Sequence, residues 1–308
     1  MPSSPSRRSP VLAASVGAQI GEGPVWDDRD DSLVFVDIDA SSMHRYRPGS
    51  GRLESYPLPA CAASMALLES GWLLLAGQGL AVCRTDGSGY TAAVPGIPLD
   101  PGRVRFNDGK VDPWGRFVVG TMSLTDRQPV AALYRMTSSG QVSKTLDRVA
   151  VSNGLGWTAD RERFYYVDSA ARRVDVFDSD PLTGQLSRRR MFVHLGGDDR
   201  GPDGLCLDQD DCVWVAFWGG SEVHRYTPDG TVDVVVEVPA SQVTSVAFGG
   251  TGLTDLYITT ARAGLSAEQI RAQPHAGDLF ILSTGTAGVP VPRFAYKWPT
   301  PAKDGAHA

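Results

Sequence analysis

The fold is decided by Asn153-Gly-Leu-Gly-Trp-Thr-Ala-Asp-Arg-Glu-Arg-Phe-Tyr-Tyr-Val-Asp168, a stretch whose pattern recurs along the chain. A polar residue is followed by a short apolar strand, a polar turn rich in Asp, and a second apolar strand. Two further clear copies are Gly23-Pro-Val-Trp-Asp-Asp-Arg-Asp-Asp-Ser-Leu-Val-Phe-Val-Asp37 and Asp203-Gly-Leu-Cys-Leu-Asp-Gln-Asp-Asp-Cys-Val-Trp-Val-Ala216. Weaker copies begin at Ser64, Asn107 and Ser245. The chain is therefore built from repeats.

The spacing of the repeats predicts an all-β, six-bladed β-propeller with four antiparallel strands per blade. The repeats start near residues 22, 64, 107, 153, 203 and 245, which lie 42 to 50 residues apart, the length of one propeller blade. We expect a strand over Val11–Val16 to close the ring beside Asp278–Leu282, which covers the exposed edges. Only Ser266–Gln273 has a helical pattern, so a parallel α/β fold is disfavoured.

We divide the chain into a disordered tail over residues 1–10, one propeller domain over residues 11–300, and a second tail over residues 301–308. The pair Arg7-Arg8 and the following apolar run resemble an export signal, but the run is short and is interrupted by Ser15 and Gly17. The four cysteines show no C-x-x-C spacing and lie beside apolar residues. We therefore expect free, structural thiols and a cytoplasmic protein.

Composition and charge exclude several kinds of partner. The chain has 308 residues, is 42% hydrophobic and 21% charged, and carries a net charge of −6, which disfavours nucleic-acid binding. No apolar run approaches the roughly 18 residues of a membrane span. The sequence does not indicate an oligomeric state.

Oxygen-bearing side chains occupy one equivalent position in all six repeats. The first strand of each propeller blade lines the axis, so the residues that begin these strands should converge at one end of the central channel. They are Glu22, Ser64, Asn107, Asn153, Asp203 and Ser245. Two carboxylates held close together repel each other, and a bound cation removes that cost. Oxygen ligands suit Ca²⁺, Mg²⁺ or Mn²⁺ better than Zn²⁺.

Each of these residues also has an ordinary structural interpretation. Asn-Gly and Asp-Gly are common turn formers, but Glu22 is not, and it occurs at the same phase of the repeat. The Asp-rich turns at 27–31 and 208–211 lack EF-hand spacing and are interpreted as solvated hairpins. The five histidines are scattered and are assigned to the surface or the core. Motifs of serine hydrolases, P-loop proteins and zinc proteases are absent.

The sequence resembles the regucalcin and gluconolactonase family of six-bladed propeller lactonases. The motifs that carry the resemblance follow one another through nearly the whole chain. They are Gly21-Glu-Gly-Pro-Val-Trp-Asp27, Arg105-Phe-Asn-Asp-Gly-Lys-Val-Asp-Pro-Trp-Gly-Arg116 with Gly120-Thr-Met122, Ser152-Asn-Gly-Leu155, Pro202-Asp-Gly-Leu205 with Val213-Trp-Val215, and Thr244-Ser-Val-Ala-Phe-Gly-Gly250.

The resemblance implies a metal-dependent hydrolase that opens an aldonolactone to its acid. It implies that Glu22, Asn153 and Asp203 bind one divalent metal ion, which the sequence leaves open among Ca, Mg, Mn, Zn and Fe. The metal would polarise the lactone carbonyl and activate water, with Asp203 as general base. Arg105 and Asn107 would hold the sugar lactone.

One departure from the family pattern affects the substrate. Animal members of the family place a glutamate shortly after the Gly-Thr-Met run, whereas this chain has Ser123-Leu-Thr-Asp126. Asp126 is our candidate for the missing substrate contact. The sugar preference is therefore left open.

Two other functions use the same predicted site. A propeller phosphotriesterase or aryl-ester hydrolase would use the same metal on a different substrate. A calcium-binding propeller would have no catalytic activity, because a fold does not determine a function. Arg105 and Asn107 argue against the second possibility, since metal storage requires neither.

Overall fold

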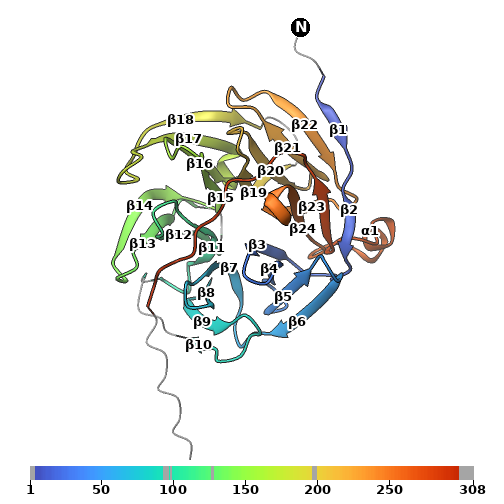
Figure 1. Ribbon diagram of the computed structural model, residues 1–308, viewed down its shortest axis with the longest axis horizontal. Helices are drawn as coiled ribbons and strands as arrows, with labels where there is room; N and C mark the ends of the chain where they lie inside the picture. The colour runs from blue at the N-terminus through green and yellow to red at the C-terminus, as the bar shows by residue number, and fades with distance from the viewer. Residues whose placement is uncertain (1–3, 93–96, 98, 126–127, 196–199, 298–308) are drawn as a thin grey trace, which may run out of the picture.

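Antiparallel β-sheets surround a central axis in the computed structural model, which describes residues 4–92, 97, 99–125, 128–195 and 200–297 (Figure 1). Four of the sheets have four strands each, which confirms an all-β, propeller-like fold with four-stranded blades. The first two sheets contain β3 (Gly21–Asp27), β4 (Ser32–Asp37), β5 (Ser42–Arg47) and β6 (Arg52–Pro57), then β7 (Ala62–Leu67), β8 (Trp72–Gly77), β9 (Leu80–Arg84) and β10 (Thr91–Ala92). The next two contain β11 (Val104–Val111), β12 (Phe117–Ser123), β13 (Ala131–Met136) and β14 (Val142–Val149), then β15 (Ser152–Trp157), β16 (Arg163–Asp168), β17 (Arg173–Ser179) and β18 (Leu186–His194).

The remaining strands form one nine-stranded sheet, where we predicted two separate blades. It contains β1 (Ser6–Arg8), β2 (Val11–Ala14), β19 (Gly201–Leu207), β20 (Val213–Trp218), β21 (Glu222–Tyr226), β22 (Val232–Glu237), β23 (Gln242–Gly249), β24 (Asp255–Ala261) and β25 (Leu279–Ser283). Two antiparallel groups within it are joined because the end of β20 and the start of β23 meet at a single residue pair, Trp218 with Gln242.

The N-terminal segment pairs with strands from the other end of the chain. Strand β2 pairs antiparallel with β25, and Val11 lies opposite Ile281, which confirms the predicted pairing of these two segments. Strand β1 was expected to be part of a disordered tail, and that expectation is wrong for Ser6–Arg8. These residues pair in parallel with the edge strand β22, and Arg7 forms an ion pair with Glu237. The unpaired backbone groups of β22 account for the difference, because they can bind an extra strand.

Neighbouring inner strands lie unusually close to one another around the axis. In chain order β3, β7, β11, β15, β19 and β23 each contact the next, and β23 contacts β3. Glycine makes this approach possible. A Cβ atom on Gly154 would lie 2.6 Å from the backbone oxygen of Asp203, and one on Gly204 would lie 2.7 Å from the Cα atom of Ser245. Between β23 and β3, Thr244 Oγ1 donates a hydrogen bond of 2.5 Å to the Gly21 carbonyl.

Every inner strand has an irregularity in its pairing near its start. The register with the second strand of the sheet shifts at or just before the polar residue that begins each repeat, for example between Glu22 and Val25 and between Pro202 and Leu205. In β11 and β15 the shift spans Asn107 and Asn153, whereas in β7 and β23 it comes just before Ser64 and Ser245. β-bulges of this kind turn side chains away from the regular alternation. The polar residues are therefore free to face the end of the channel.

Apolar side chains fill the spaces between adjacent sheets. Leu74, Phe106 and Phe117, for example, belong to one buried cluster that joins the second and third sheets. All four cysteines are free, as expected, and three of them are buried. The predicted helix is confirmed as α1 (Ala267–Ala272), whose N-cap residue Ser266 forms a capping box with Gln269. Two 3-10 turns lie at Ser169–Ala171 and Thr251–Leu253. In the described part of the chain, no helix has the length and apolar character needed to cross a membrane.

The Asp-rich turns are only partly solvated hairpins, so that interpretation needs a correction. Asp28 is exposed, but Asp27 and Asp208, which begin the two turns, are buried. Asp208 accepts hydrogen bonds from Arg225 Nε at 2.7 Å and from Trp214 Nε1 at 2.8 Å. The buried carboxylates are retained because each has charged or hydrogen-bonding partners.

Because the inner strands lie so close together, adding a methyl group to a glycine on an inner strand should destabilise the protein more than adding one to a glycine away from the axis. Replacing Gly154 with Ala places a Cβ atom against backbone atoms and should lower the free energy of unfolding by about 1–3 kcal/mol. Gly49→Ala is the matched control, because a Cβ atom there has no neighbour within 4 Å. Urea denaturation of both variants measures the difference. Equal midpoints for the two variants would contradict this account of the axis.

Candidate functional site

Glu22 and Asp203 are buried acidic side chains on different inner strands, with only 8% and 7% of their surface exposed. Burial raises the pKa of Glu22 well above its usual range, and the nearby charges of Asp203 and Asp108 raise it further. The Gly23 N–H, which donates a hydrogen bond of 2.8 Å to Glu22 Oε2, acts in the opposite direction. Burial, followed by the charge of Asp108, also raises the pKa of Asp203. The site thus holds carboxyl groups that resist simultaneous ionisation.

Asn153 is held in one orientation by hydrogen bonds to both ends of its amide. Its Oδ1 accepts a hydrogen bond of 3.1 Å from Asn107 Nδ2, and its Nδ2 donates one of 2.8 Å to Ser169 Oγ. Ser169 in turn donates to the Pro202 carbonyl at 2.6 Å. This chain of bonds connects β11, β15 and β19 at the end of the channel where Asp203 lies. It fixes Asn153 Oδ1 as an acceptor.

Arg105 and Asn107 form a second row beside Asn153. Arg105 Nη1 donates to the Phe106 carbonyl at 2.8 Å and to Asn107 Oδ1 at 3.0 Å. Burial lowers the pKa of Arg105, and nearby Cys61, Glu22 and Asp39 act in the opposite direction. The other guanidinium N–H groups of Arg105 make no hydrogen bond within the described residues. They are therefore available to a bound molecule.

Asp108 is a buried acid of the site that the repeat pattern did not single out. It follows Asn107 inside the register shift between Phe106 and Gly109, and its Oδ1 accepts a hydrogen bond of 2.7 Å from the Gly109 N–H. Burial raises its pKa, opposed by Lys110 and by this hydrogen bond. The sequence does not display this bulge, which is why the repeat pattern identifies Asn107 and not Asp108 as the polar residue of this strand.

Three predicted residues, Ser64, Ser245 and Asp126, remain to be placed. Ser64 is buried and its Oγ has no hydrogen-bond partner within the described residues, while Ser245 packs against Gly204 on the next inner strand. Asp126 lies outside the described residues. The structure thus brings Glu22, Asp203, Asn153, Asn107 and Arg105 to the same end of the inner strands.

The chemistry of this donor set fits a divalent cation. In the part of the chain that the structure describes, no group of three His, Cys, Asp or Glu side chains could hold a metal ion. Glu22, Asn153 and Asp203 offer a different set, two carboxylates and one amide oxygen. All-oxygen sets of this kind suit Ca²⁺ and Mg²⁺. A cation between the carboxylates would offset the repulsion that raises their pKa values.

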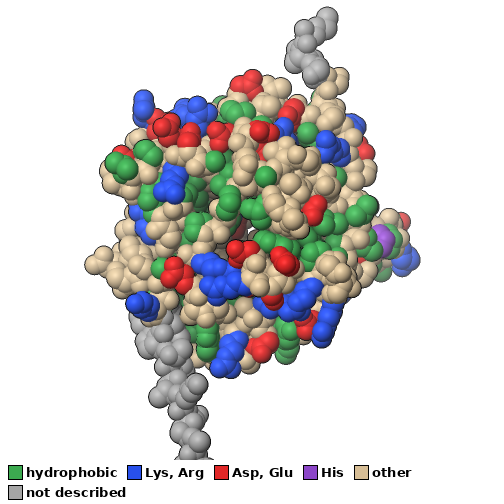
Figure 2. Space-filling model, in the orientation of Figure 1, with side chains coloured by type: hydrophobic (Ala, Val, Ile, Leu, Met, Phe, Trp, Pro, Cys, Tyr) green, Lys and Arg blue, Asp and Glu red, His purple; other side chains and the backbone are tan. Residues whose placement is uncertain are grey.

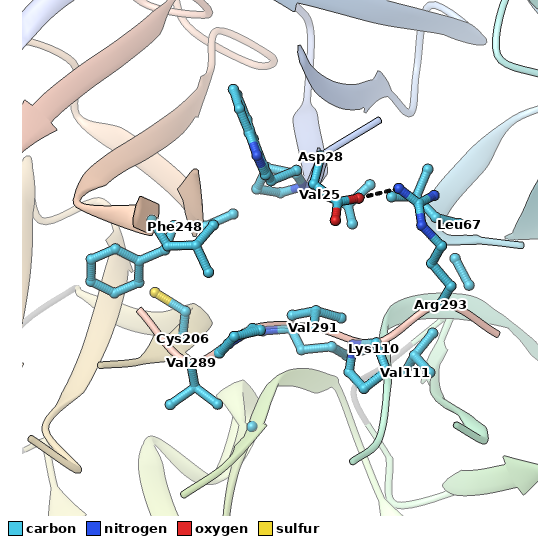
Figure 3. Close-up of a pocket in the computed structure, with 18 of the residues that line it drawn as sticks. Val25, Asp28, Leu67, Lys110, Val111, Cys206, Phe248, Val289, Val291 and Arg293 are labelled. Atoms are coloured by element: carbon cyan, nitrogen blue, oxygen red, sulfur yellow. Dashed lines mark hydrogen bonds and ion pairs between the residues drawn. The ribbon is translucent and has the colours of Figure 1, made fainter. Parts of the chain in front are cut away.

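A cavity of about 1340 Å³ opens at the other end of the channel (Figure 3). Its walls come from the far ends of the inner strands, including Trp26, Leu67, Val111, Leu207 and Phe248. Glu22, Asn153 and Asp203 do not line it. The three candidate metal ligands therefore lie outside the cavity, whereas Asp108 lines its inner end.

Comparisons with known proteins cover nearly the whole propeller-like region. A family model described as "SMP-30/Gluconolactonase/LRE-like region" matches residues 20–262. Regucalcin from Oryctolagus cuniculus is 38% identical over 278 residues, which cover 88% of this chain and 93% of the relative.

Solved structures show the same architecture. The calcium-binding protein regucalcin from Agrobacterium tumefaciens superposes with a TM-score of 0.86 and 27% identity, covering 95% of this chain and 98% of the other. A gluconolactonase from Xanthomonas campestris superposes with a TM-score of 0.69 over 91% of this chain and 89% of the other. At 20% identity, the second likeness concerns the fold alone.

The raised pKa values predict how the stability of the metal-free protein depends on pH. Glu22 and Asp203 bind protons more tightly in the folded than in the unfolded state. Their contribution to stability is therefore complete below about pH 4, near the unfolded pKa values, and is lost as the pH rises toward the folded ones. Relative to the double variant Glu22→Gln/Asp203→Asn, the wild type should lose stability above pH 4. Urea denaturation in chelator at several pH values measures this, and parallel pH profiles would contradict it.

A divalent cation should reverse this effect in the wild type only. At a free concentration of 100 times its dissociation constant, a ligand of the folded state adds about 2.7 kcal/mol to the free energy of unfolding. We expect CaCl₂, MgCl₂ or MnCl₂ to raise the denaturation midpoint of the wild type and to leave the double variant nearly unchanged. Equal stabilisation of both proteins would place the cation elsewhere.

Proposed function

The chain belongs to the SMP-30/Gluconolactonase/LRE-like family, and on that premise we propose that it hydrolyses a sugar lactone to the corresponding aldonic acid with the help of one divalent metal ion. One observation carries this proposal. The buried carboxylates of Glu22 and Asp203 lie at the same end of the inner strands as the amide of Asn107 and the guanidinium group of Arg105. An oxygen cluster alone would serve to bind a cation. Arg105 and Asn107 add hydrogen-bonding groups that a substrate rich in hydroxyls requires.

In this proposal Glu22, Asn153 and Asp203 hold the metal ion. Their oxygens are a hard-donor set, and the two amide hydrogen bonds of Asn153 fix the orientation of its Oδ1. When bound, a divalent cation supplies Lewis acidity toward a carbonyl oxygen and lowers the pKa of water toward about 7. Ca, Mg, Mn, Zn and Fe remain the candidates. The description of the Agrobacterium relative as calcium-binding supports calcium among them.

Asp203 is the general base in the reaction that we propose. It accepts a proton from the water molecule that attacks the lactone carbonyl carbon, and the bond from that carbon to the ring oxygen then breaks. The departing ring oxygen takes up a proton, so one water molecule is consumed and one hydroxy acid is formed. Because burial raises the pKa of Asp203, it is a usable base only when a nearby positive charge keeps it ionised.

Arg105 and Asn107 orient the sugar. Asn107 donates through Nδ2 to the Ser152 carbonyl at 2.8 Å and accepts from Arg105 through Oδ1. The amide is therefore held on both sides, and the unused guanidinium N–H groups of Arg105 can donate to sugar hydroxyls. We retain Asp126 as a candidate substrate contact because it follows the motif where relatives carry a glutamate.

The architecture that we propose for this activity is a closed ring of six blades within a single domain over residues 11–300. It is supported by the contacts of the six inner strands in a complete cycle and by the single residue pair that joins the two halves of the nine-stranded sheet. The four free cysteines support a cytoplasmic location.

A calcium-binding protein without catalytic activity is the second candidate function. The description of the Agrobacterium relative as a calcium-binding protein favours it. Such a protein would bind Ca²⁺ with Arg105 or Asn107 removed and would open no lactone. A metal-dependent aryl-ester hydrolase or phosphotriesterase would use the same carboxylates and would prefer nitrophenyl esters or organophosphates to lactones.

A panel of lactones tests the proposed function directly. Metal-loaded protein should release acid from five- and six-membered aldonolactones faster than spontaneous hydrolysis, as followed with a pH indicator. The same preparation is assayed with nitrophenyl acetate and with an organophosphate. No acid release from any lactone with any of the candidate metals would refute the proposal.

The proposed base is tested by Asp203→Asn, which should reduce kcat about 10²–10⁴-fold, the usual contribution of general acid–base catalysis. Asp210→Asn is the matched control, because this acid lies on the rim next to the same strand and is exposed. Its kcat should equal that of the wild type. Calorimetric titration with metal identifies how much of the loss in Asp203→Asn reflects weaker metal binding.

The substrate row is tested by Arg105→Lys. Lysine keeps the charge but loses the planar set of donors, so KM should rise about tenfold or more if one charged hydrogen bond is lost. Metal affinity should stay unchanged. An unchanged KM would remove Arg105 from the substrate site.

A further inference from the structure

The cavity at the other end of the channel is covered by the segment 287–295, here called the strap. Figure 1 shows the strap as the red segment that crosses the open end of the ring. On one side Val289 N–H donates to the Leu207 carbonyl at 3.0 Å, and on the other Phe294 N–H donates to the Leu67 carbonyl at 2.8 Å. The strap therefore connects β19 and β7 across the axis.

An ion-pair cluster fastens the strap beside the cavity. Arg293 Nη2 donates to Asp27 Oδ1 at 2.6 Å and also pairs with Asp28 (Figure 3). Figure 2 shows hydrophobic side chains around the hollow near the middle of this face, with charged side chains at its edge. The fold thus maintains a covered space in place of a filled core.

Apolar side chains form one continuous part of the cavity wall beside its polar groups. Val25, Val111, Phe248, Val289 and Val291 surround the space in the close-up view (Figure 3). Burial raises the pKa of the Cys206 thiol, also in the wall, to about 12, so this group is neutral at pH 7. Ligand sites typically combine such walls with a few polar groups.

The incompletely paired polar groups of the wall are N–H donors. Trp157 is only 5% exposed, and its Nε1 has no hydrogen-bond partner within the described residues. Arg293 Nη1 is likewise buried without a partner. The Lys110 ammonium donates one hydrogen bond, of 2.9 Å, to the Leu205 carbonyl, and the described residues provide no other acceptor for it. Buried donors without acceptors are costly and rare in native proteins.

Four acidic residues line the wall: Asp28, Asp31 and Glu69 lie at its exposed rim, and Asp108 lies at its inner end. Asp28 is 77% exposed and pairs with Arg293. Asp108 accepts a hydrogen bond from the Gly109 N–H and lies deeper in the channel, where it interacts electrostatically with Glu22 and Asp203. The buried atoms of the wall that lack a hydrogen-bond partner within the described residues, Trp157 Nε1 and Arg293 Nη1, are both N–H donors and are therefore complementary to an acceptor.

We propose that the cavity beneath the strap, which none of the three candidate metal ligands lines, is a second ligand site that binds an apolar carboxylic acid. The hydrocarbon part lies among the apolar walls, and the carboxylate accepts hydrogen bonds from Lys110 and Trp157. The cavity volume of about 1340 Å³ accommodates an aromatic or a medium-chain aliphatic acid. This site is independent of the proposed lactone hydrolysis.

Calorimetric titration of the full, metal-loaded chain with 2-naphthoate tests the proposal. We expect saturable binding that is about tenfold tighter than binding of 2-naphthalenemethanol, the neutral compound with the same ring, since hydrogen bonds to a charged group contribute more than neutral ones. Dodecanoate should compete with naphthoate. Equal affinity for acid and alcohol, or no saturable binding, would overturn the proposal.

Two substitutions locate the carboxylate. Lys110→Met should weaken naphthoate binding about tenfold, and Trp157→Phe, which keeps an aromatic ring, should weaken it about threefold. Lys144→Met and Trp72→Phe are matched controls, because these residues do not line the cavity, and both should bind like the wild type. If both test variants fold and bind naphthoate normally, the assignment is wrong.

One more variant and one shortened chain test whether naphthoate binds in the cavity and not elsewhere. Glu22→Gln should bind naphthoate with unchanged affinity, and loss of binding in this variant would assign the acid to the metal site. A chain that ends at Lys297 should also bind as the full chain does. Tighter binding by the shortened chain would show that the C-terminal segment is the natural occupant, which would overturn the proposal.

Discussion

The approach of six inner strands around one axis is the constraint on which the rest of the structure depends. Gly154 and Gly204 allow backbones of adjacent inner strands to touch, and no larger residue fits there without displacement. Because the backbones are so close, polar residues that begin these strands cannot continue the regular alternation of a β-strand. Bulges turn them toward the end of the channel instead. The candidate site is thus a consequence of the packing that forms the ring.

Burial at the axis determines the electrostatics of that site. Burial raises the pKa values of Glu22 and Asp203, Asp108 raises both further, and Asp203 adds to the rise at Glu22. The neutral groups that surround them are fixed by hydrogen bonds, with Asn153 held between Asn107 and Ser169. A bound cation would offset the repulsion between the two carboxylates and so keep both ionised at neutral pH. At the opposite end of the same channel, the buried atoms without a hydrogen-bond partner within the described residues are N–H donors.

The repeat pattern predicted the class of the fold, the phase of the polar residues and the pairing of β2 with β25. Such features depend on periodic apolar strands and turn residues, which a sequence displays directly. It did not predict the bulge that brings Asp108 beside Asn107, the burial of Asp27 and Asp208, or the parallel pairing of β1. These depend on contacts between segments far apart in the chain. The cavity and its strap were missed for the same reason, since residues 287–295 have no pattern of their own.

The pairing of β2 with β25 also constrains the order in which the molecule can fold. Its two partners are more than 260 residues apart in the sequence, so this pairing must wait until β25 has left the ribosome. Until then β2 has no partner strand, and β24, which pairs with β25 on one side, has an open edge there. Contacts of such large sequence separation slow folding and leave strand edges open to wrong pairing. The N-terminal strand β2 must therefore stay without its native partner while all the strands between it and β25 are made.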